Sequence, residues 1–197
     1  MINEIVLATG NKGKIREFSG LLEDVFGRII SLNDLESPPE VVEDGATFRE
    51  NALKKARAIA AYSGKPALAD DSGLAVDALG GRPGVYSARY AGESATDKDN
   101  ITKLLTELGG IENRSARFVC VLALVTPDGR EMTAEGVCEG VILTEPRGEG
   151  GFGYDPVFYL PEYGKTMAEI PPELKNRLSH RARAAESLIK LLNEKGW

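Results

Sequence analysis

The chain has 197 residues, of which 42% are apolar and 27% are charged, a composition typical of a globular domain in water. Lysine and arginine number 24 against 30 aspartate and glutamate residues, and the formal net charge of -6 disfavours a broad electrostatic hold on nucleic acid. Two cysteines and one histidine exclude a disulfide scaffold and a histidine-rich zinc cluster, so we expect any metal to have oxygen ligands.

Hydropathy also argues against a membrane protein. No apolar stretch approaches the roughly 20 residues of a membrane-spanning helix. The first residues, Met1-Ile2-Asn3-Glu4, lack the basic and apolar regions of a signal peptide. We therefore expect no membrane partner, a cytoplasmic location and one domain over residues 1–197.

The N-terminal segment predicts a buried strand, a glycine turn and an amphipathic helix. Residues 4–8 are apolar and β-branched, and the turn Thr9-Gly10-Asn11-Lys12-Gly13-Lys14 follows them. Apolar residues then recur at three- and four-residue steps from Ile15 to Phe26, and Gly27 is placed to end the helix. A helix N-terminus with two lysines favours anion binding, but the Walker pattern is absent and ordinary turn glycines explain the motif equally well.

An acidic loop and a second helix come next. Residues 37–45 are acidic and contain Pro38 and Pro39, which predicts a loop. Thr47 and Glu50 have the spacing of a capping box, so we expect a helix from there to about residue 62, ended by Gly64.

The segment Pro66 to Ala69 predicts a short strand that ends at Asp70-Asp71-Ser72-Gly73. Adjacent carboxylates in a strand point to opposite faces, so we do not expect Asp70 and Asp71 to form one acid–base pair. One of them would reach a ligand, and Glu43 or Asp44 would supply a second carboxylate for Mg²⁺ bound with substrate phosphates. Solvated turn residues or helix caps are the alternative explanation.

The second half of the chain predicts a mixed sheet. Residues 79–86 predict a loop rich in glycine and proline. A third helix that ends at Gly109-Gly110 is expected to face inward with Ile101, Leu104, Leu105 and Leu108. Segments 116–126 and 130–143 flank a Pro-Asp-Gly turn and predict an antiparallel hairpin. A strand at 157–160 and a C-terminal helix at 182–192, capped by Ser179, complete the pattern.

The segment Gly148 to Gly153 matches G-x-G-x-x-G, but a strand follows it where a dinucleotide-binding motif requires a helix. We therefore reject that interpretation and expect a loop that offers Phe152 for stacking on a base, or else a glycine hinge with Phe152 in the core. His180 and Arg181 begin the last helix, and their side chains can donate hydrogen bonds to an acceptor-rich ligand. A serine hydrolase is disfavoured because the sequence lacks G-x-S-x-G.

Six stretches taken in order resemble the inosine triphosphate pyrophosphatase family, also called HAM1-like or non-standard purine nucleoside triphosphate pyrophosphatases. They span nearly the whole chain, so a chance match to all six is improbable. The stretches are Leu7-Ala8-Thr9-Gly10-Asn11-Lys12-Gly13-Lys14, Thr47-Phe48-Arg49-Glu50-Asn51-Ala52, Ala69-Asp70-Asp71-Ser72-Gly73-Leu74, Gly80-Gly81-Arg82-Pro83-Gly84-Val85-Tyr86-Ser87-Ala88-Arg89-Tyr90, Gly151-Phe152-Gly153-Tyr154-Asp155-Pro156 and Ser179-His180-Arg181.

The resemblance implies an α/β fold: a single bilobed domain over residues 1–197, with an elongated mixed β-sheet flanked by helices and a central cleft, forming a homodimer. It implies Mg²⁺-dependent hydrolysis of ITP, dITP and XTP between the α and β phosphates. The products would be the monophosphate and pyrophosphate, and the reaction would clean the nucleotide pool.

The resemblance also implies roles for individual residues. Asp71 would be the general base and a metal ligand together with Glu43, and Ser72 would contact the substrate. The triphosphate would be held by Thr9, Gly10, Asn11, Lys12, Gly13 and Lys14, with positive charge added by Lys55 and Arg89. Phe152 would stack on the purine, and the other residues at the base would be Gly153, Tyr154, Asp155, Lys175, His180 and Arg181.

Two other functions are compatible with the same motifs. One is a Maf-like pyrophosphatase acting on modified or pyrimidine nucleotides. The other is a nucleotide-binding regulator without turnover. Asp71 and the neighbouring acids argue against it, because a binder gains little from carboxylates beside phosphates.

Adenine would be rejected because it presents an amino donor where inosine and xanthine present a carbonyl acceptor.

Overall fold

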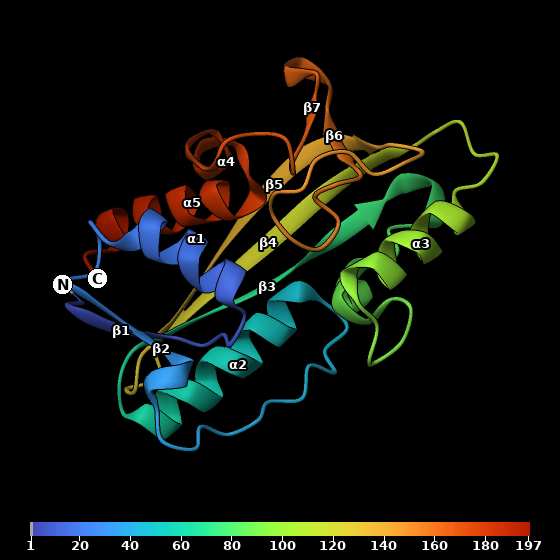
Figure 1. Cartoon of the computed structure of the whole chain (residues 1–197). Coiled ribbons are helices and arrows are strands. Elements are labelled where there is room, and N and C mark those ends of the chain that lie inside the picture. The colour runs from blue at the N-terminus through green and yellow to red at the C-terminus, as the bar shows by residue number, and fades with distance from the viewer. Residues whose placement is uncertain (1) are drawn as a thin grey trace. The chain divides into compact units, whose positions relative to one another are not determined.

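A computed structural model describes residues 2–197 of the chain (Figure 1). Its helices and strands alternate in the first half of the chain, whereas most of the later strands follow one another directly. In chain order the elements are β1 (Glu4–Leu7), α1 (Lys12–Leu22), β2 (Arg28–Ser31), the 3₁₀ helix η1 (Leu32–Asp34), α2 (Phe48–Ser63), β3 (Ala67–Val76), η2 (Asp77–Leu79), η3 (Gly84–Arg89), α3 (Asp97–Glu107), β4 (Ser115–Val125), β5 (Glu131–Ile142), β6 (Phe158–Leu160), η4 (Pro161–Tyr163), β7 (Lys165–Thr166), α4 (Pro172–Leu178) and α5 (His180–Lys195).

The strands form one seven-stranded sheet in the order β2-β1-β3-β4-β5-β6-β7. Strand β1 pairs in parallel with both β2 and β3, whereas β6 pairs antiparallel with both β5 and β7. The predicted mixed α/β sheet flanked by helices is therefore confirmed. Among residues 2–197, no helix is both long and apolar enough to cross a membrane.

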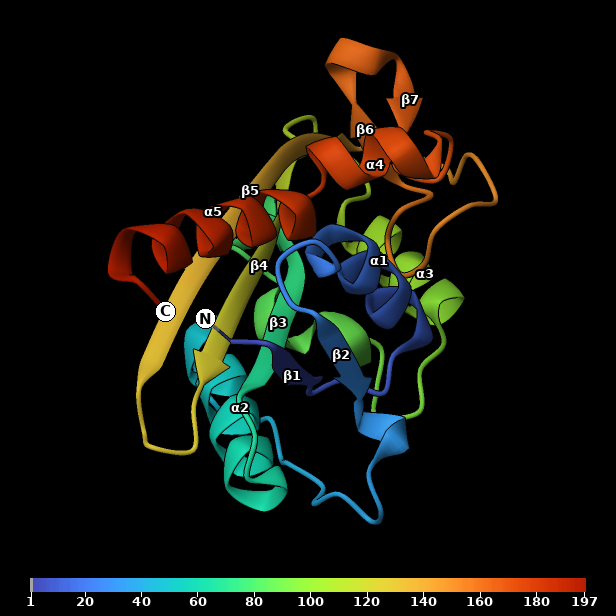
Figure 2. The ribbon, with the colours of Figure 1, turned by 90° about the vertical axis from the view of Figure 1, so that its left-hand side faces the viewer.

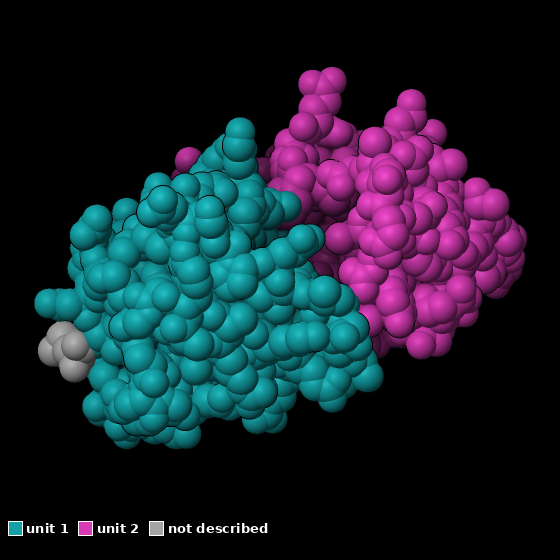
Figure 3. All heavy atoms as spheres, turned by 90° about the horizontal axis from the view of Figure 1, so that it is seen from below, with its two compact units in different colours: residues 1–71, 120–136, 180–197 teal, residues 72–119, 137–179 magenta. Residues whose placement is uncertain are grey.

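The chain divides into two compact units, which Figure 3 shows in teal and magenta. Unit 1 comprises residues 1–71, 120–136 and 180–197, and unit 2 comprises residues 72–119 and 137–179. The boundaries at 71/72, 119/120 and 136/137 fall inside β3, β4 and β5. Each of these three strands therefore contributes residues to both units.

In unit 1, helices cover both faces of the strands. Helices α1 and α5 lie side by side in Figures 1 and 2 and pack large apolar side chains such as Phe18 and Leu188 on one face. Helix α2 covers the other face with small side chains such as Ala52 and Ala56. Strand β3 follows the same division, because Leu68 packs in the α1/α5 core while Ala69 packs in the α2 core.

Unit 2 has its own core, which contains Leu104 of α3 and two phenylalanines from the strands on either side of β5, Phe118 of β4 and Phe158 of β6. The rings of Phe118 and Phe158 lie 4.2 Å apart between centroids. The two cysteines are buried in different cores, Cys120 in unit 1 and Cys138 in unit 2, and neither forms a disulfide. Both cysteines are therefore buried thiols.

The ends of α2 agree with the sequence except in one hydrogen bond. Gly64 ends the helix in the left-handed conformation with φ of 63°. The Thr47 side chain accepts from the Glu50 N–H at 3.2 Å, as expected for an N-cap. The Glu50 carboxylate, however, accepts from the Ala46 N–H at 2.7 Å, so the acidic side chain fixes the residue before the cap.

Several predicted boundaries are wrong. Helix α1 ends at Leu22 and not near Gly27, although Val25 and Phe26 still pack in the same core. An apolar period cannot separate the end of a helix from a turn that packs on the same side. Strand β2, helix α4 and strand β7 were not predicted because each is short. The 3₁₀ helix at residues 84–89 begins inside the predicted loop and extends beyond it.

Candidate active site

The turn between β1 and α1 is ordered by its own side chains. The Thr9 hydroxyl accepts from the Asn11 N–H at 3.2 Å, and the Asn11 side chain accepts from the Lys14 N–H at 3.0 Å as the N-cap of α1. Helix α1 therefore begins at Lys12, and Gly13 lies inside its first turn. Exposed Gly10 and Lys12 complete the turn, whose position at a helix N-terminus suits an anion.

Asp70 is a fully buried carboxylate held by cations. Its Oδ2 lies 2.7 Å from Lys14 Nζ, and its side chain has no exposed surface. Burial alone would raise the pKa of Asp70, but attraction to Lys14, Lys55 and Arg181 outweighs burial and holds that pKa well below its usual range. Asp70 is therefore a permanent anion that fixes the Lys14 ammonium.

Asp71 has the opposite character. Burial, together with repulsion from Glu43, raises the pKa of Asp71 to about 6, against the lowering effects of Lys55, Lys14 and a hydrogen bond from Asn51. That bond runs from Asn51 Nδ2 to Asp71 Oδ2 at 2.9 Å. A carboxyl with this pKa can hold and release a proton near neutral pH, as a general base requires.

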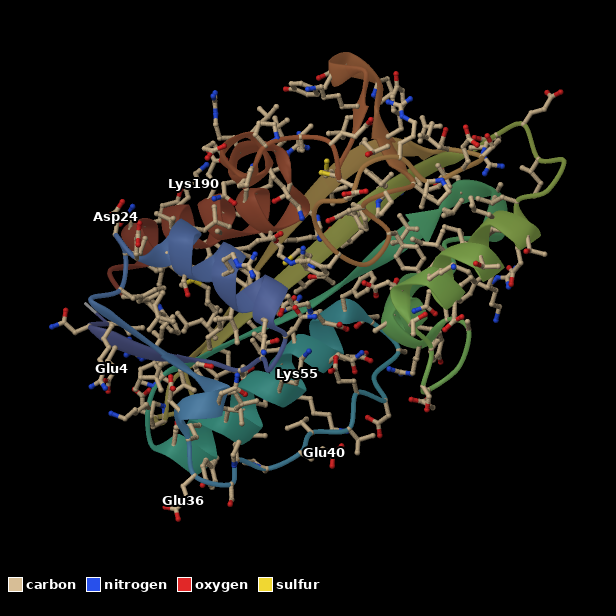
Figure 4. All side chains as sticks on the ribbon, viewed as in Figure 1. Glu4, Asp24, Glu36, Glu40, Lys55 and Lys190 are labelled. Atoms are coloured by element: carbon tan, nitrogen blue, oxygen red, sulfur yellow. The ribbon has the colours of Figure 1, made fainter. Side chains whose placement is uncertain are left out.

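Lys55 joins the acidic loop to these carboxylates. It projects from α2 (Figure 4), and its Nζ lies 2.8 Å from Glu43 Oε2 in the loop. Burial lowers the pKa of Lys55, but attraction to Asp70, Glu43 and Asp71 outweighs burial and raises it. The structure thus brings Lys14, Lys55, Glu43 and Asp71 into one electrostatic group within unit 1.

His180 and Arg181 open α5 and are both buried in unit 1. Arg181 Nη1 lies 3.1 Å from Glu17 Oε2 of α1, which ties the start of α5 to the helix that follows the glycine turn. Arg181 also acts electrostatically on Asp70. These two predicted base-reading residues therefore belong to the unit that contains the turn between β1 and α1.

The predicted stacking residue, Phe152, lies in the glycine loop of unit 2. Its N–H donates to Asp155 Oδ2 at 3.0 Å, and the same oxygen lies 2.7 Å from Lys175 Nζ of α4. Lys175 Nζ also lies 5.1 Å from the centre of the Phe152 ring. The structure thus brings Phe152, Asp155 and Lys175 together, although α4 itself was not predicted.

The Phe152 loop is also tied to α3. The Gly153 N–H donates to Asp97 Oδ2 at 2.7 Å, and Asp97 is the first residue of that helix. A pocket of about 730 Å³ lies between the loop and α3, lined by Phe152 and by apolar side chains such as Ile101 and Leu105. Phe152 is only partly buried. The alternative of a glycine hinge that places Phe152 in the core is therefore wrong.

The remaining predicted residues have local partners in unit 2. The buried Tyr154 hydroxyl donates to the Ser87 carbonyl at 2.8 Å, and burial raises its pKa. The guanidinium carbon of Arg89, Cζ, lies over the Tyr86 ring at 5.2 Å from its centre. Ser72 is half-buried and follows Asp71 within β3.

A sequence model described as the Ham1 family matches residues 5–191. The chain belongs to the Ham1 family. Proteins called dITP/XTP pyrophosphatase in Desulforamulus reducens and Geobacillus kaustophilus are 54% identical over 192 residues and 56% identical over 189 residues. These alignments cover 96% of this chain and 96% of the first relative, and 95% of this chain and 93% of the second. The family predicted from the six motifs is confirmed.

Solved structures of the Ham1 family share the fold. The Staphylococcus aureus Ham1 protein is 44% identical with a TM-score of 0.87, and the match covers 98% of this chain and 99% of that one. A HAM1 protein from Coxiella burnetii is 47% identical with a TM-score of 0.89, covering 98% of this chain and 100% of that one. The mixed sheet is therefore the fold of experimentally determined family members.

The donor set of this Ham1 chain fits a magnesium ion held in part by substrate. No group of three or more histidine, cysteine, aspartate or glutamate side chains within residues 2–197 is arranged to hold a metal. Glu43 and Asp71 nevertheless interact electrostatically, and repulsion from Glu43 helps to raise the pKa of Asp71. Mg²⁺ keeps several waters and combines one or two carboxylates with phosphates, so two protein ligands are enough.

The sequence predicts that Asp70 and Asp71 follow the end of a strand. In the structure they instead lie inside the ten-residue strand β3. The polar residues and the glycine of this segment are typical of a turn. Inside the strand, Lys14 of α1 and Lys55 of α2 offset the cost of burying two carboxylates. The predicted division of Asp70 and Asp71 between opposite faces is confirmed, because Asp70 contacts α1 and Asp71 contacts α2.

Sequence reasoning missed the roles of four residues. Asp70 fixes Lys14, Glu17 fixes Arg181, Asp97 fixes the Phe152 loop, and Asn51 fixes Asp71. The sequence could have indicated a role for Asn51, because asparagine is unfavourable inside a helix unless its side-chain amide has a hydrogen-bond partner. The three acids had none, because their partners lie 56 or more residues away.

Proposed function

We propose that this Ham1-family chain hydrolyses non-standard purine nucleoside triphosphates, namely dITP, ITP and XTP, to the monophosphate and pyrophosphate. The observation that carries the proposal is the unit 1 group in which two lysines and a helix N-terminus accompany Asp71, whose pKa is about 6. The names of the relatives, dITP/XTP pyrophosphatase, support the same reaction.

The triphosphate is the part of the substrate assigned to unit 1. Its four negative charges need cations and N–H donors, which Lys14, Lys55 and the turn from Thr9 to Gly13 supply. Arg89 and Ser72 of unit 2 are assigned to the same substrate by the family resemblance. Mg²⁺ bound by Glu43 and Asp71 would neutralise charge on the leaving pyrophosphate.

Asp71 is the general base in this proposal. A water oxygen attacks the α-phosphorus, the bond from that phosphorus to the bridging oxygen breaks, and pyrophosphate leaves with the bonding electron pair. The proton of the water passes to the Asp71 carboxylate and then to solvent. Burial raises the pKa of the metal-free Asp71 carboxyl, and the same carboxylate would orient the water when it also holds the metal.

The family resemblance assigns base selection to Phe152, Gly153, Tyr154, Asp155, Lys175, His180 and Arg181. The Phe152 ring provides a stacking face, and the Lys175 ammonium provides donors for a carbonyl at the six-position of the purine. Adenine presents an amino group there and would leave a buried donor without its partner, a mismatch worth up to about 10⁴- to 10⁵-fold. Guanine shares the carbonyl, so its rejection depends on the two-amino group.

The wider setting belongs to the proposal as well. We assign residues 1–197 to one catalytic domain that acts as a homodimer in the cytoplasm, with nucleotides as its partners rather than nucleic acid or membrane. Sedimentation of the purified chain tests the dimer, which requires a mass of twice the monomer at micromolar concentration.

The reaction is tested by incubating the protein and Mg²⁺ with dITP, ITP, XTP, ATP, GTP and dTTP and separating products by anion exchange. Monophosphate and pyrophosphate from the inosine and xanthine nucleotides alone are expected. Orthophosphate release, or equal turnover of all six nucleotides, contradicts the proposal. Turnover of dTTP in preference to dITP favours the Maf-like alternative.

The Asp71→Asn variant separates the hydrolase from a nucleotide-binding regulator. Loss of the base is expected to lower kcat by about 10²- to 10⁴-fold while nucleotide binding persists. Turnover at the wild-type rate would remove Asp71 from the mechanism.

A further inference from the structure

The last part of the acidic loop runs back along α2, and four successive loop residues each contact the helix. Three of these contacts use charged side chains of α2. Glu43 contacts Lys55 at 2.8 Å, Asp44 contacts Lys54 at 2.5 Å, the Gly45 N–H donates to Asn51 Oδ1 at 2.7 Å, and the Ala46 N–H donates to Glu50 Oε2 at 2.7 Å. Only the Gly45 contact uses a neutral, buried side chain, since Asn51 is 1% exposed.

The Asn51 amide has a second partner in the opposite direction. Its Nδ2 donates to Asp71 Oδ2 at 2.9 Å while its Oδ1 accepts from Gly45. One planar group therefore connects the loop that carries Glu43 with the strand that carries Asp71. Because an amide is planar, its donor and acceptor directions are fixed relative to each other, and the two partners are fixed with them.

Helix formation does not account for asparagine at this position. Asparagine is among the weaker helix formers, and burial of an amide without partners costs free energy. The backbone of Asn51 already makes the ordinary helical bond to Thr47, so its side chain is not required for the helix. Both amide ends are instead used on the two segments that bear the proposed metal-binding carboxylates.

We propose that Asn51 is a positioning residue that holds Asp71 and the Glu43 loop in one fixed arrangement for a shared divalent ion and for attack by water. The inference rests on the proposed function. One oxygen of Asp71 is held by the amide, which restricts rotation of the carboxylate. Outer partners of metal ligands that act in this way typically change affinity or activity by about 10- to 100-fold when they are removed.

Gly45 provides a second way to break the bridge without touching Asp71. A Cβ atom at this position would lie 2.6 Å from Asn51 Oδ1 and 2.9 Å from Glu50 Cβ, both too close for an ordinary contact. Alanine there forces the loop away from the amide while the Asn51-to-Asp71 bond remains available. Asn51→Leu, in contrast, has a similar size and removes both bonds.

The test compares Asn51→Leu and Gly45→Ala with wild type and with Lys54→Ala. Lys54 anchors the same loop through an exposed ion pair, which contributes little. Two properties are measured for each protein: kcat and KM for dITP, and the rise in melting temperature produced by Mg²⁺ alone. For Asn51→Leu and Gly45→Ala we expect kcat to fall by about 10- to 100-fold with KM within about threefold, and the Mg²⁺ effect to shrink by at least about half.

The control and the contrary outcomes are distinct. Lys54→Ala should stay within about twofold of wild type in both measurements. If Asn51→Leu or Gly45→Ala is folded and keeps the wild-type kcat and Mg²⁺ response, Asn51 is structural only and the proposal is overturned. If Asn51→Leu fails to fold, Gly45→Ala decides. If wild type does not hydrolyse dITP, the proposed function fails, and the Mg²⁺ response still tests the positioning role.

Discussion

Asp70 and Asp71 are neighbours in one strand, yet their surroundings move their pKa values in opposite directions. Asp70 faces α1, where Lys14 lies 2.7 Å away and cations hold its pKa well below the usual range. Asp71 faces α2, where burial and Glu43 raise its pKa to about 6. Alternation along the strand therefore separates a structural anion from a group that can exchange protons near neutral pH.

The raised pKa of Asp71 predicts a pH-dependent stability in metal-free buffer. Between pH 3.8 and about 6 the folded chain binds the Asp71 proton more tightly than the unfolded chain, so the contribution of Asp71 to stability falls as pH rises through this window and stays lost above it. The shift corresponds to about 3 kcal/mol. In Asp71→Asn this fall should disappear, which urea unfolding with EDTA at pH 4 and pH 7 measures.

The comparison within each protein provides the control for that measurement. Each protein is compared with itself at two pH values, so any effect of the substitution that does not depend on pH cancels. An equal fall in wild type and Asp71→Asn would contradict the raised pKa of Asp71.

Phe152 carries a prediction about base binding. Replacing the ring in Phe152→Leu removes the stacking face and should raise KM for dITP by about 10- to 100-fold, since base stacking on an aromatic side chain contributes about 1–3 kcal/mol. Phe48→Leu, at a half-buried position of α2, is the matched control and should leave KM unchanged. Steady-state kinetics with dITP distinguishes them, and an unchanged KM for Phe152→Leu removes the ring from base binding.

At the scale of elements, α5 approaches β5 at a glycine. A Cβ atom on Gly136 would lie 2.2 Å from the His180 carbonyl and 2.2 Å from the Ala184 N–H nitrogen. No side chain fits between the two backbones, so the first turn of α5 lies directly on the strand. This contact sets the position of the turn that contains His180 and Arg181.

Gly136→Ala should therefore destabilise the fold. The methyl group meets backbone atoms that cannot rotate away, so α5 must shift, and we expect a loss of about 1–3 kcal/mol in the free energy of unfolding. Glu135→Ala, at the exposed neighbouring position, should stay within about 0.5 kcal/mol of wild type. Urea unfolding of both variants checks this, and a Gly136→Ala variant as stable as wild type would show that the close approach is absent.

At the scale of the whole molecule, the two units share strands. Strand β3 contributes residues 67–71 to unit 1 and residues 72–76 to unit 2, and β4 and β5 are divided in the same way. A strand that loses its pairing in one unit loses the support of its neighbours along its length. Separate unfolding of the units is therefore disfavoured.

Calorimetry should show one cooperative unfolding transition. Leu188→Ala in the unit 1 core and Phe158→Ala in the unit 2 core each remove a fully buried side chain, at a cost of about 2–5 kcal/mol. Both variants should lower the same single melting temperature. Two transitions, with each variant shifting only one of them, would show that the units unfold independently.

Sequence patterns were sufficient for features that depend on neighbouring residues. Apolar periodicity predicts α1, α3 and α5, the capping-box spacing predicts α2, and the Pro-Asp-Gly turn predicts the β4–β5 hairpin. Thr47 and Gly64 mark the ends of α2, because caps act on backbone groups within one turn. The six motifs were sufficient for the family, and the family resemblance assigns Lys14, Lys55, Asp71, Phe152 and Lys175 to the site, which stays a prediction.

Only the tertiary structure decided the surroundings of these residues. Asp70 and Asp71 read as a turn from the sequence, and their positions inside β3 depend on cations from helices elsewhere in the chain. The role of Asn51 likewise depends on a loop and a strand that meet in space. A pKa and a side-chain orientation follow from burial and from charges across the fold, which local sequence does not contain, whereas turns and caps follow from the backbone preferences of adjacent residues.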